Sequence, residues 1–405
     1  MSSDVAELER AVDGMPDDWR DVAIADVVAM LPGFAFKSEH FVTDTDGGLP
    51  LIRIRDLGQT ATVTRYVGGY DEAFAVQDGD ILVGMDGEFA AVRWQGGKAL
   101  LNQRVLKLST ARPDAMDEGY LFYRVQPALL ELEQTISGTT VKHLSTKDLK
   151  RLTWQIPSLD EQRRIAKVLR SVDEAIAAAD AVATSMLRAS KTMRHELLNV
   201  APDGTVIDLP PDWTVLPLEA LASVERGKFS IRPRNDPRYF GGSTPFIQTG
   251  DITTAGDYIT RHTQTLNDLG VGVSRVFAAG TIMTTIAANI GDFAIASYPV
   301  ACPDSVVGIE ANADVHPFWL YSVLTCFKAA LDRAATQNAQ KNINLQTLRP
   351  LQIPVPPPSL MIELAETFAA AADGALQAKA SVAKLTATKQ SLMSDLLSGR
   401  VRVPA

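Results

Sequence analysis

Two long segments dominate the hydrophobic pattern of the chain, and in both of them apolar or small residues recur at alternating spacings of four and three. In the first segment these positions are Ile165, Leu169, Val172, Ile176, Ala179, Ala183, Met186, Ser190, Met193 and Leu197. In the second they are Leu364, Phe368, Ala371, Ala375, Ala378, Val382, Leu385, Lys389, Leu392 and Leu396. This spacing is the a/d seam of a heptad repeat, which calls for a partner helix. At about 1.5 Å per residue, each predicted helix spans roughly 58 Å.

Two arrangements satisfy such a seam: each stripe packs on its own domain, or the two helices pack on each other. Small residues near the middle of the seams, such as Ala183 and Ala375, favour pairing because they let the two backbones approach closely. Pairing of related halves around a pseudo-two-fold axis gives an antiparallel pair. Ser190 and Lys389 are polar at seam positions, where they either fix the register or lie near a frayed end.

The two segments belong to an internal repeat that covers most of the chain. Residues 51–57 match residues 246–252 at an offset of 195, and residues 142–198 match residues 341–397 at an offset of 199. The offset changes only ahead of the long segments, so the insertions lie in the parts that precede them. A tandem duplication explains this pattern better than chance does.

Short alternating runs typical of strands precede each long segment. They lie at residues 61–66, 80–83 and 90–94 in the first half and at residues 281–286, 293–297 and 305–309 in the second. Helical patches follow at residues 118–133 and 317–335, and prolines mark the start of each long helix. The sequence therefore predicts an α+β protein with two mixed α/β domains joined by a long antiparallel two-helix coiled coil. The predicted domains are residues 1–157 and 201–357, and the predicted helices are residues 158–200 and 358–405.

Composition narrows the class of protein. Hydrophobic residues make up 46% and charged residues 21% of the chain, so both halves can bury a core. We expect no membrane-spanning helix, since no run of about 18 uncharged apolar residues is present, and no signal peptide. Cys302 and Cys326 are the only cysteines, and no histidines cluster. We therefore expect reduced thiols in a cytoplasmic protein, with neither a disulfide framework nor a metal site.

The net charge of −9 argues against a simple nucleic-acid binder, which usually carries a basic patch. The distribution of charge weakens that objection. Residues 1–50 contain eleven acids and three bases, so the rest of the chain is close to neutral. Local basic stretches there are still able to meet phosphates.

The most basic stretch lies in the second half, at residues 226–239. It contains one acid, Asp236, and the candidates for DNA contact are Arg226, Lys228, Arg232, Arg234, Arg238 and Tyr239. A basic loop interrupted by glycine and proline suits contacts to phosphates and base edges. The alternative is an ordinary solvated loop.

A second set of candidates precedes each proline boundary. In the first half these are Lys142, His143, Lys147 and Lys150, and in the second half they are Gln340, Lys341 and Asn342. Asn and Gln read adenine, and Arg and Lys read guanine, in the major groove of DNA. The same residue types are common in ordinary loops, so both interpretations stay open. Weaker single candidates in the first half are Arg53, Arg55, Arg65, Arg93 and Arg104.

Enzyme signatures are mostly absent from the sequence. No G-x-x-x-x-G-K-[ST] loop occurs, which argues against an ATPase site. Gly270 and Gly272 lack the third glycine of a dinucleotide fingerprint. The run Asp236-Pro-Arg-Tyr239 has arginine where an amino-methyltransferase motif has proline, and no glycine-rich cofactor motif lies upstream.

The boundary ahead of each long helix resembles a known family. The run from Ile156 to Ala166, with Pro157, Leu159 and Glu161-Gln162, is similar to the P-x-L-x-E-Q-x-x-I-A boundary of type I restriction–modification specificity subunits. Residues 138–140, Leu197-Leu198 and residues 239–252 resemble the same family. The second boundary departs from the pattern, because Leu360-Met361 replaces the Glu-Gln pair and leaves any contact of that pair in doubt there.

The resemblance implies a non-catalytic DNA-recognition subunit. Each globular domain would be a target-recognition domain that reads one half of a split, asymmetric site in double-stranded DNA, and the helices would set the spacer. The helices would also bind two methyltransferase (modification) subunits carrying S-adenosylmethionine, and restriction/translocase subunits using ATP and Mg²⁺ would join them. This chain would then bind no cofactor and no membrane. The alternatives are a specificity subunit of a methylation-only or other non-classical system, and a non-DNA coiled-coil scaffold.

Overall fold

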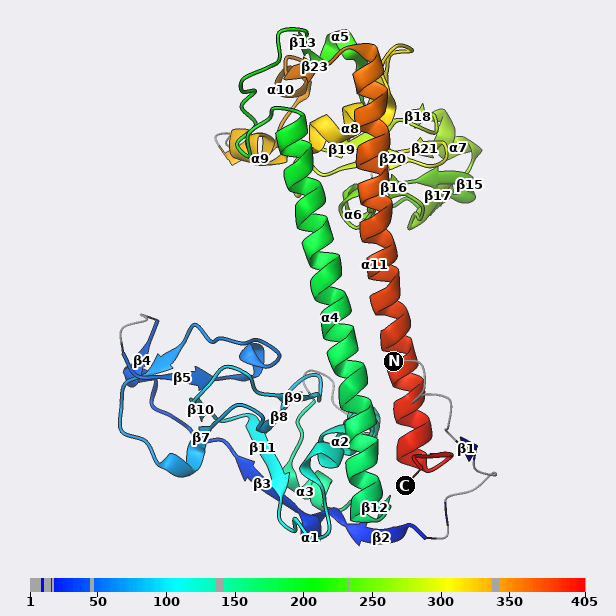
Figure 1. Ribbon diagram of the computed structural model, residues 1–405. Helices are drawn as coiled ribbons and strands as arrows, with labels where there is room; N and C mark the ends of the chain where they lie inside the picture. Colours follow the sequence, from blue (N-terminus) through cyan, green and yellow to red (C-terminus); the bar gives the residue numbers. More distant parts are fainter. Residues whose placement is uncertain are drawn as a thin grey trace. The chain divides into compact units, whose positions relative to one another are not determined.

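The computed structural model describes residues 9–10, 16, 18–43, 47–135, 142–231, 233–336 and 342–404. The chain divides into two compact units, each of which we describe by itself. Unit 1 comprises Met1–Ala178 and Ala383–Ala405, and unit 2 comprises Ala179–Val382. The long helices α4 (Leu159–Leu197) and α11 (Pro358–Ser398) each contribute one segment to each unit (Figure 1). The division between the two units therefore falls within the long helices.

Local sequence explains where both long helices begin and end. The Ser158 hydroxyl accepts the backbone N–H of Glu161 at 3.4 Å, and α4 carries acids in its first turn and Arg194 and His195 in its last, which complement the helix dipole. Helix α11 begins at Pro358, which fits the first helical position. It ends before Gly399, whose φ of 75° is the left-handed conformation of a helix C-cap.

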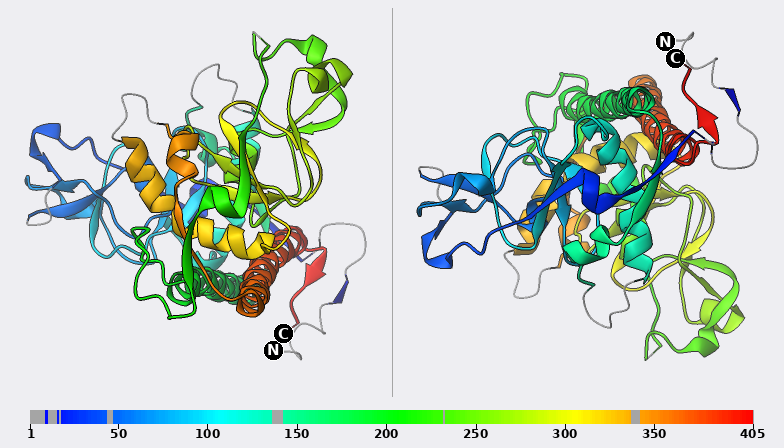
Figure 2. Two further views of the ribbon diagram at one scale, coloured as in Figure 1. Left: turned by 90° about the horizontal axis from the view of Figure 1, so that it is seen from above. Right: turned by 90° about the horizontal axis from the view of Figure 1, so that it is seen from below.

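Unit 1 contains two larger sheets, built mostly from antiparallel pairs. The first has the order β3 (Val28–Pro32), β11 (Val105–Thr110), β8 (Ile81–Gly84), β9 (Ala91–Arg93). The second has the order β4 (Phe41–Val42), β6 (Arg65–Tyr66), β5 (Leu49–Ile52), β10 (Ala99–Leu101), β7 (Ala75–Val76). Two ribbons complete the strands: β2 (Arg20–Ala23) with β12 (Thr153–Ile156), and β1 (Glu9–Arg10) with β24 (Val401–Arg402), the dark blue and red arrows near the chain ends in Figure 2. The helices ahead of α4 are α1 (Ile24–Val27), α2 (Glu118–Thr135) and α3 (Thr146–Lys150), with 3-10 turns at Ser38–His40, Ile54–Asp56 and Glu72–Phe74.

Unit 2 repeats this plan. One sheet has the order β14 (Ala222–Arg226), β22 (Val306–Ala311), β19 (Ile282–Thr285), β20 (Phe293–Ala296), β16 (Tyr258–Ile259). The other has the order β17 (Gln264–Leu266), β15 (Phe240–Phe246), β21 (Val300–Ala301), β18 (Val276–Phe277), and β13 (Thr214–Pro217) pairs with β23 (Gln352–Val355). The helices are α5 (Leu218–Leu221), α6 (Thr249–Thr253), α7 (Asp268–Gly272), α8 (Pro317–Cys326), α9 (Lys328–Thr336) and α10 (Leu345–Leu348), with a 3-10 turn at Pro237–Tyr239.

The sheet topology confirms the internal repeat. The antiparallel order β3-β11-β8-β9 of unit 1 corresponds to β14-β22-β19-β20 of unit 2. In the other sheet, a parallel pair recurs at the same place, as β5 with β10 and as β15 with β21. The α+β class, with mixed sheets in each half, is therefore as the sequence predicts.

One predicted strand is much shorter than expected. Of residues 61–66, only Arg65–Tyr66 pair as a strand. The Thr62 hydroxyl donates to the carbonyl oxygens of Leu51 at 3.1 Å and Thr64 at 2.9 Å, and it accepts the backbone N–H of Thr64 at 3.1 Å. A threonine that bonds to nearby backbone groups in this way competes with a regular ladder.

The seam of unit 1 joins both the domain core and the other long helix. Ile165 and Leu169 are buried in one core with Leu396 and Leu397 near the end of α11, while Val172, Ile176 and Leu385 are half-buried. Further along, Lys389 Nζ lies 2.6 Å from Asp173 Oδ1. Sequence numbers thus rise along α4 as they fall along α11, so the segments are antiparallel. Lys389 thus forms an ion pair between the two helix segments, and its role in fixing the register stays a prediction.

The seam of unit 2 also joins the domain core and the other long helix. Here the start of α11 and the end of α4 are the segments involved. Leu364 and Phe368 near the start of α11 are buried in one core with Leu198, the residue that follows α4. Ala183 and Ala375 are buried, and Val382 is half-buried. A Cβ placed on Gly374 would lie 3.2 Å from the terminal methyl of Met186. The Met186 side chain of α4 therefore reaches the surface of α11 at this glycine.

The predicted seam fails at its last position in α4. Leu197 is 41% exposed, whereas its neighbour Leu198 is fully buried. A seam with a period of 3.5 residues drifts about 20° per heptad on a straight α-helix. From Ile165 to Leu197 this drift adds up to nearly 100°, which is about the angle between two consecutive residues of an α-helix. The residue that faces the core is therefore Leu198 and not Leu197.

Candidate nucleic-acid interface

Three turns meet at one edge of unit 1, and they bring together residues that are distant in the sequence. They are the β8–β9 turn, the β10–β11 turn and the stretch that precedes α3. Leu144 N–H donates to Met85 O at 2.7 Å, and Gly87 N–H donates to Lys142 O at 3.0 Å. Met85 N–H donates to Arg104 O at 2.9 Å. These backbone bonds hold the candidates Lys142 and His143 against the β8–β9 hairpin turn, which is in turn bonded to the β10–β11 turn.

A polar cluster of Asp86, Arg104 and His143 lies at this edge. His143 Nδ1 is 2.6 Å from Asp86 Oδ1, so the imidazole proton lies on Nδ1, since a carboxylate only accepts. Arg104 Nη1 lies 3.6 Å from the same carboxylate oxygen and its side chain is 55% exposed. Arg104 also has a φ of 71°, which costs a non-glycine residue about 1–2 kcal/mol. The result is an exposed guanidinium held by a strained turn and a carboxylate.

The other first-half candidates are placed nearby but are not part of this cluster. Lys142 Nζ lies 3.8 Å from Glu133 Oε1. Lys147 and Lys150 are exposed on α3. That helix is capped by Ser145 and Asp148, and the hydrogen bond from the Ser145 hydroxyl lowers the pKa of Asp148.

The corresponding edge of unit 2 has the same backbone frame with different side chains. Ile343 N–H donates to Ile286 O at 3.0 Å, and Ala287 forms a bridge with Asn342, as Asp86 does with His143. Asn342 is exposed. Gln340 and Lys341 lie outside the described residues.

The frame explains one strained residue of unit 2. Ala288 has a φ of 62°, and the matching residue of unit 1 is Gly87, with a φ of 81°. A Cβ added to Gly87 would have no heavy atom within 4 Å. Glycine and alanine at this position of the turn therefore differ in backbone strain and not in steric clashes.

We therefore predict opposite effects for exchanging these two residues. Ala288→Gly is expected to raise the free energy of unfolding by about 1 kcal/mol, and Gly87→Ala to lower it by about the same amount. Urea denaturation of the two variants measures both changes. A destabilised Ala288→Gly variant would show that the alanine side chain contributes packing that outweighs the strain.

The basic loop of unit 2 is held largely by carboxylates and carbonyls of its own unit. Arg234 Nη2 lies 2.9 Å from Asp304 Oδ1, and Arg226 donates to the carbonyl oxygen of Asp304. Arg238 makes a two-pronged contact with Asp236, the shorter distance being 2.6 Å. These side chains are nevertheless exposed, as is Lys228. Contact of this loop with DNA stays a prediction.

Two candidates of this loop differ from the exposed bases. Tyr239 is half-buried, with its ring edge-on to Phe229 at 6.4 Å between centroids. It packs in a small aromatic cluster with Phe240 and Phe246. Arg232 lies outside the described residues.

The Glu-Gln pair of the first boundary makes contacts within unit 1. The fully buried Gln162 side chain accepts the N–H of Asp117 at 2.9 Å and donates to the carbonyl oxygens of Ala115 and Pro157, both at 3.0 Å. Glu161 is 2% exposed and meets Arg402 through two oxygens, at 2.6 and 2.7 Å. The pair is therefore a structural tie at the start of α4.

The second boundary preserves one of these contacts with a different atom. Met361 occupies the position of Gln162, and its Sδ accepts the N–H of His316 at 3.4 Å. His316 in turn occupies the position of Asp117, 199 residues later. Leu360, in place of Glu161, packs against the hydrophobic core of unit 2. The second copy thus keeps the contact to the N–H ahead of α8, made by sulfur in place of an amide oxygen, and has an apolar contact where Glu161 makes an ion pair.

Comparison with known proteins places this repeat in a family. The sequence model described as the type I restriction modification DNA specificity domain matches the chain twice, at residues 16–181 and 210–360. This chain belongs to that family. The two matches correspond to the two copies of the repeat.

Relatives of the family resemble the chain over nearly its whole length. The specificity subunit of the type I restriction enzyme EcoBI of Escherichia coli is 26% identical over 431 residues, covering 97% of this chain and 89% of that protein. The specificity subunit of the type I restriction enzyme MjaVIII of Methanocaldococcus jannaschii is 23% identical over 410 residues, covering 96% and 94%.

Two solved structures share the fold of this family. The S subunit of a type I restriction-modification system from M. genitalium aligns with a TM-score of 0.58 at 16% identity, covering 96% of this chain and 98% of that one. A chain from a structure of the assembly and conformational transition of the type I R-M system aligns with a TM-score of 0.60 at 15% identity, covering 96% and 99%.

The described part of the chain shows neither a metal-binding group nor a membrane-spanning helix. It contains no group of three histidine, cysteine, aspartate or glutamate side chains arranged to hold a metal ion. None of its helices combines the length and the apolar character that crossing a membrane requires. Cys302 and Cys326 are free and buried, and burial raises the pKa of both thiols.

Sequence reasoning did not predict that Asp86, Arg104 and His143 lie together at this edge of unit 1. It named His143, treated Arg104 as a weak single candidate, and did not name Asp86. The Asp86-Gly87 pair between two alternating runs is a hairpin-turn signal that marks the place. Nothing in the spacing of the three residues indicates that they meet.

Proposed function

We propose that this chain is the DNA-specificity subunit of a type I restriction–modification complex and that it reads a bipartite, asymmetric site in double-stranded DNA. The observation that carries the proposal is the repeated sheet topology, together with a family match to each copy. Two copies with the same backbone frame are suited to two half-sites. Their edges carry different side chains, Asp86 and His143 in one and Ala287 and Asn342 in the other, which favours two different half-site sequences.

The partners follow from the same role. Two methyltransferase subunits would carry S-adenosylmethionine, and restriction/translocase subunits would use ATP and Mg²⁺, in the cytoplasm where the host DNA lies. This chain would supply recognition and no catalysis. The unbroken helices α4 and α11 would act as a spacer between the two readers, since rigid geometry fixes the separation of half-sites.

The test is methylation of DNA by the complex. The chain is co-expressed with the methyltransferase subunit of the same locus, and methyladenine is mapped across the host genome. We expect one split motif, methylated only when this chain is present. The proposal fails if no defined motif is methylated. Replacing residues 18–157 by the first domain of a relative is expected to change one half of the motif and leave the other.

Arg104 is the residue we expect to read a base in the first half-site. An exposed guanidinium held in place by Asp86 is suited to the two acceptors of guanine, and each good bidentate contact discriminates by about 1–3 kcal/mol. Arg104→Ala is expected to relax the preference at one position of one half-site, as measured by methylation of a randomised-site library. Arg112→Ala is the control, since Asp114 occupies two donors of this exposed guanidinium, at 2.9 and 2.7 Å, whereas Asp86 meets Arg104 through one nitrogen at 3.6 Å. Equal relaxation at both half-sites would contradict the assignment.

A further inference from the structure

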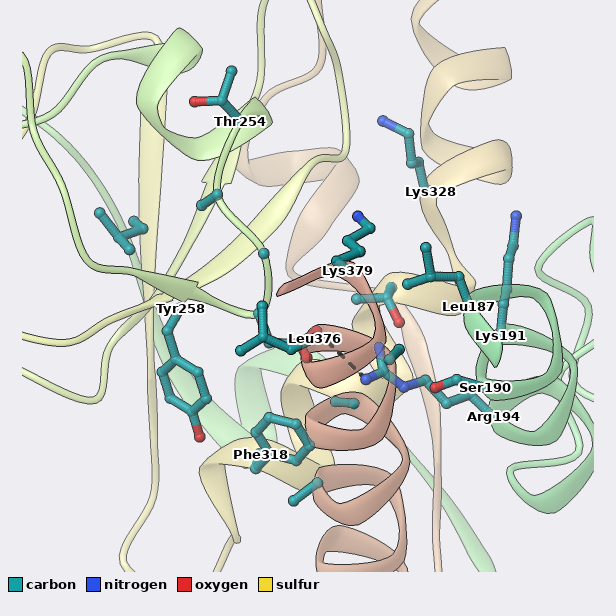
Figure 3. Close-up of a pocket in the computed structure, with 18 of the residues that line it drawn as sticks. Leu187, Ser190, Lys191, Arg194, Thr254, Tyr258, Phe318, Lys328, Leu376 and Lys379 are labelled. Atoms are coloured by element: carbon teal, nitrogen blue, oxygen red, sulfur yellow. Dashed lines mark hydrogen bonds and ion pairs between the residues drawn. The ribbon is translucent and has the colours of Figure 1, made fainter. Parts of the chain in front are cut away.

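A groove of about 1480 Å³ lies within unit 2, between its two helix segments and its globular part (Figure 3). Its walls come from residues 187–195 of α4, residues 369–379 of α11, the segment 251–263 and helices α8 and α9. None of the predicted DNA contacts lines it. It is therefore a separate feature of the unit.

Large apolar side chains that are in contact with solvent line the groove. Leu376 is 66% exposed, Tyr258 is 46% exposed and Leu187 is 41% exposed. The Tyr258 ring stacks on Phe318 at 5.9 Å between centroids, which fixes its orientation. Single exposed apolar residues are normal on a protein surface, but a group gathered in one concave site marks an interaction surface.

Three lysines from three helices form one rim of this groove: Lys191 of α4, Lys328 of α9 and Lys379 of α11. Figure 3 shows their side chains extending to the same side of the groove. Lys328 is paired with Asp292, whereas Lys191 and Lys379 are exposed and have no carboxylate within 4.0 Å among the described residues. Four acids line the groove. Asp257 is bound by Arg194 and Tyr321, and Asp251 accepts from the Gln248 N–H and the Thr263 hydroxyl. Asp332 is half-buried on α9, and Asp373 is exposed on α11.

The first copy of the repeat does not carry the exposed leucines and lysines of this groove at the matching positions. The positions that match Leu187 and Lys191 are Thr386 and Gln390, and those that match Leu376 and Lys379 are Ala177 and Asp180. A pair of identical methyltransferase subunits would use surfaces that both copies share. This step rests on the proposed function, and it indicates a partner that binds the chain once.

We infer that the groove binds an amphipathic helix of one protein partner, with an apolar ridge flanked by acidic side chains. The six residues of α11 that line the groove lie between residues 369 and 379, a stretch of about 15 Å, which corresponds to about three turns of a partner helix. The apolar ridge covers Leu376, Leu187 and Tyr258, and the acidic flank faces Lys191 and Lys379. A DNA backbone suits the site less well, because it offers no apolar surface to cover the leucines.

A designed peptide tests the groove directly. The probe is a fluorescein-labelled peptide of about 15 residues with leucines at helical i, i+4, i+7 and i+11 positions and glutamates beside them. Its control is a scrambled peptide of the same composition. We expect saturable binding of the first peptide to the full chain in fluorescence anisotropy, weakened by salt, and at least about tenfold weaker binding of the scrambled one.

A four-fold variant replaces four groove residues of unit 2 by the residues at the matching positions of the first copy. The four changes are Leu187→Thr, Lys191→Gln, Leu376→Ala and Lys379→Asp. All four positions are exposed, so we expect the variant to fold and to bind the peptide at least about tenfold more weakly. The control variant, Lys167→Gln with Lys384→Gln, changes exposed lysines of the same helices in unit 1 and is expected to bind as the wild type does.

Three outcomes would overturn the inference: equal binding of both peptides, unchanged binding by the four-fold variant, or uniformly weaker binding of that variant to DNA duplexes of any sequence. The last outcome would assign the groove to nucleic acid. Site-specific methylation by the wild-type chain is measured separately. Failure of the groove and failure of the proposed function are therefore distinguishable.

Discussion

Replacing Arg402 by methionine is expected to lower the free energy of unfolding of unit 1 by about 3 kcal/mol, near the lower end of the cost of breaking a buried ion pair. Glu161 is 2% exposed, and both of its carboxylate oxygens meet Arg402. Without the guanidinium, a buried carboxylate loses its charged partner. The lower end applies because the Arg402 side chain is 32% exposed, which lets water reach the site.

Urea denaturation measures this loss, and amide hydrogen exchange in the first turn of α4 assigns it to unit 1. The double variant Glu161→Leu, Arg402→Met is the control, since leucine occupies the matching position of the second copy. We expect the double variant to recover most of the lost stability, because the stranded charge is removed. If the double variant is no more stable than Arg402→Met, the loss comes from the packing of the C-terminal strand and not from the carboxylate.

Gln162→Ala is expected to lower the free energy of unfolding by about 3 kcal/mol or more. The substitution leaves Asp117 N–H and the carbonyl oxygens of Ala115 and Pro157 without their partner, and each unsatisfied buried group costs about 1–3 kcal/mol. Part of this cost is recovered if water enters the space that the side chain leaves.

The second copy of the repeat supplies the controls for this prediction. Gln162→Met introduces the residue of the second copy, which keeps one weak acceptor and loses both donors, so we expect an intermediate loss. Met361→Leu removes only the sulfur contact to His316 and preserves volume, so it is expected to cost less than about 1.5 kcal/mol. A Gln162→Met variant as stable as the wild type would show that the two donated hydrogen bonds contribute nothing.

Local patterns predicted much of the architecture. The prolines, the heptad spacing and Gly399 depend on neighbouring residues, so the helices α4 and α11 lie close to the predicted ranges. The self-alignment identified the repeat, and the sheet topologies confirm it. The seam failed at Leu197 because a fixed heptad count ignores the drift of an α-helix, which only the packed structure resolves.

The candidate site was predicted less completely. Arg226, Lys228, Arg234 and Arg238 are exposed, as a DNA-contacting loop requires, but Arg234 and Arg238 are ion-paired with Asp304 and Asp236. Charge counting along the chain recognised Asp236 and missed Asp304, which is distant in sequence. The grouping of Arg104 with Asp86 and His143 was missed for the same reason.

The sequence by itself determined the family, the repeat and the two long helices, because these depend on spacing along the chain. Tertiary structure alone decided what the side chains do. Gln162 and Glu161 became internal ties because Ala115, Asp117 and Arg402 fold onto the start of α4. The groove of unit 2 arose where segments around residues 190, 258, 328 and 376 meet. Contacts between distant residues depend on how the sheets and helices pack, and no local pattern encodes that packing.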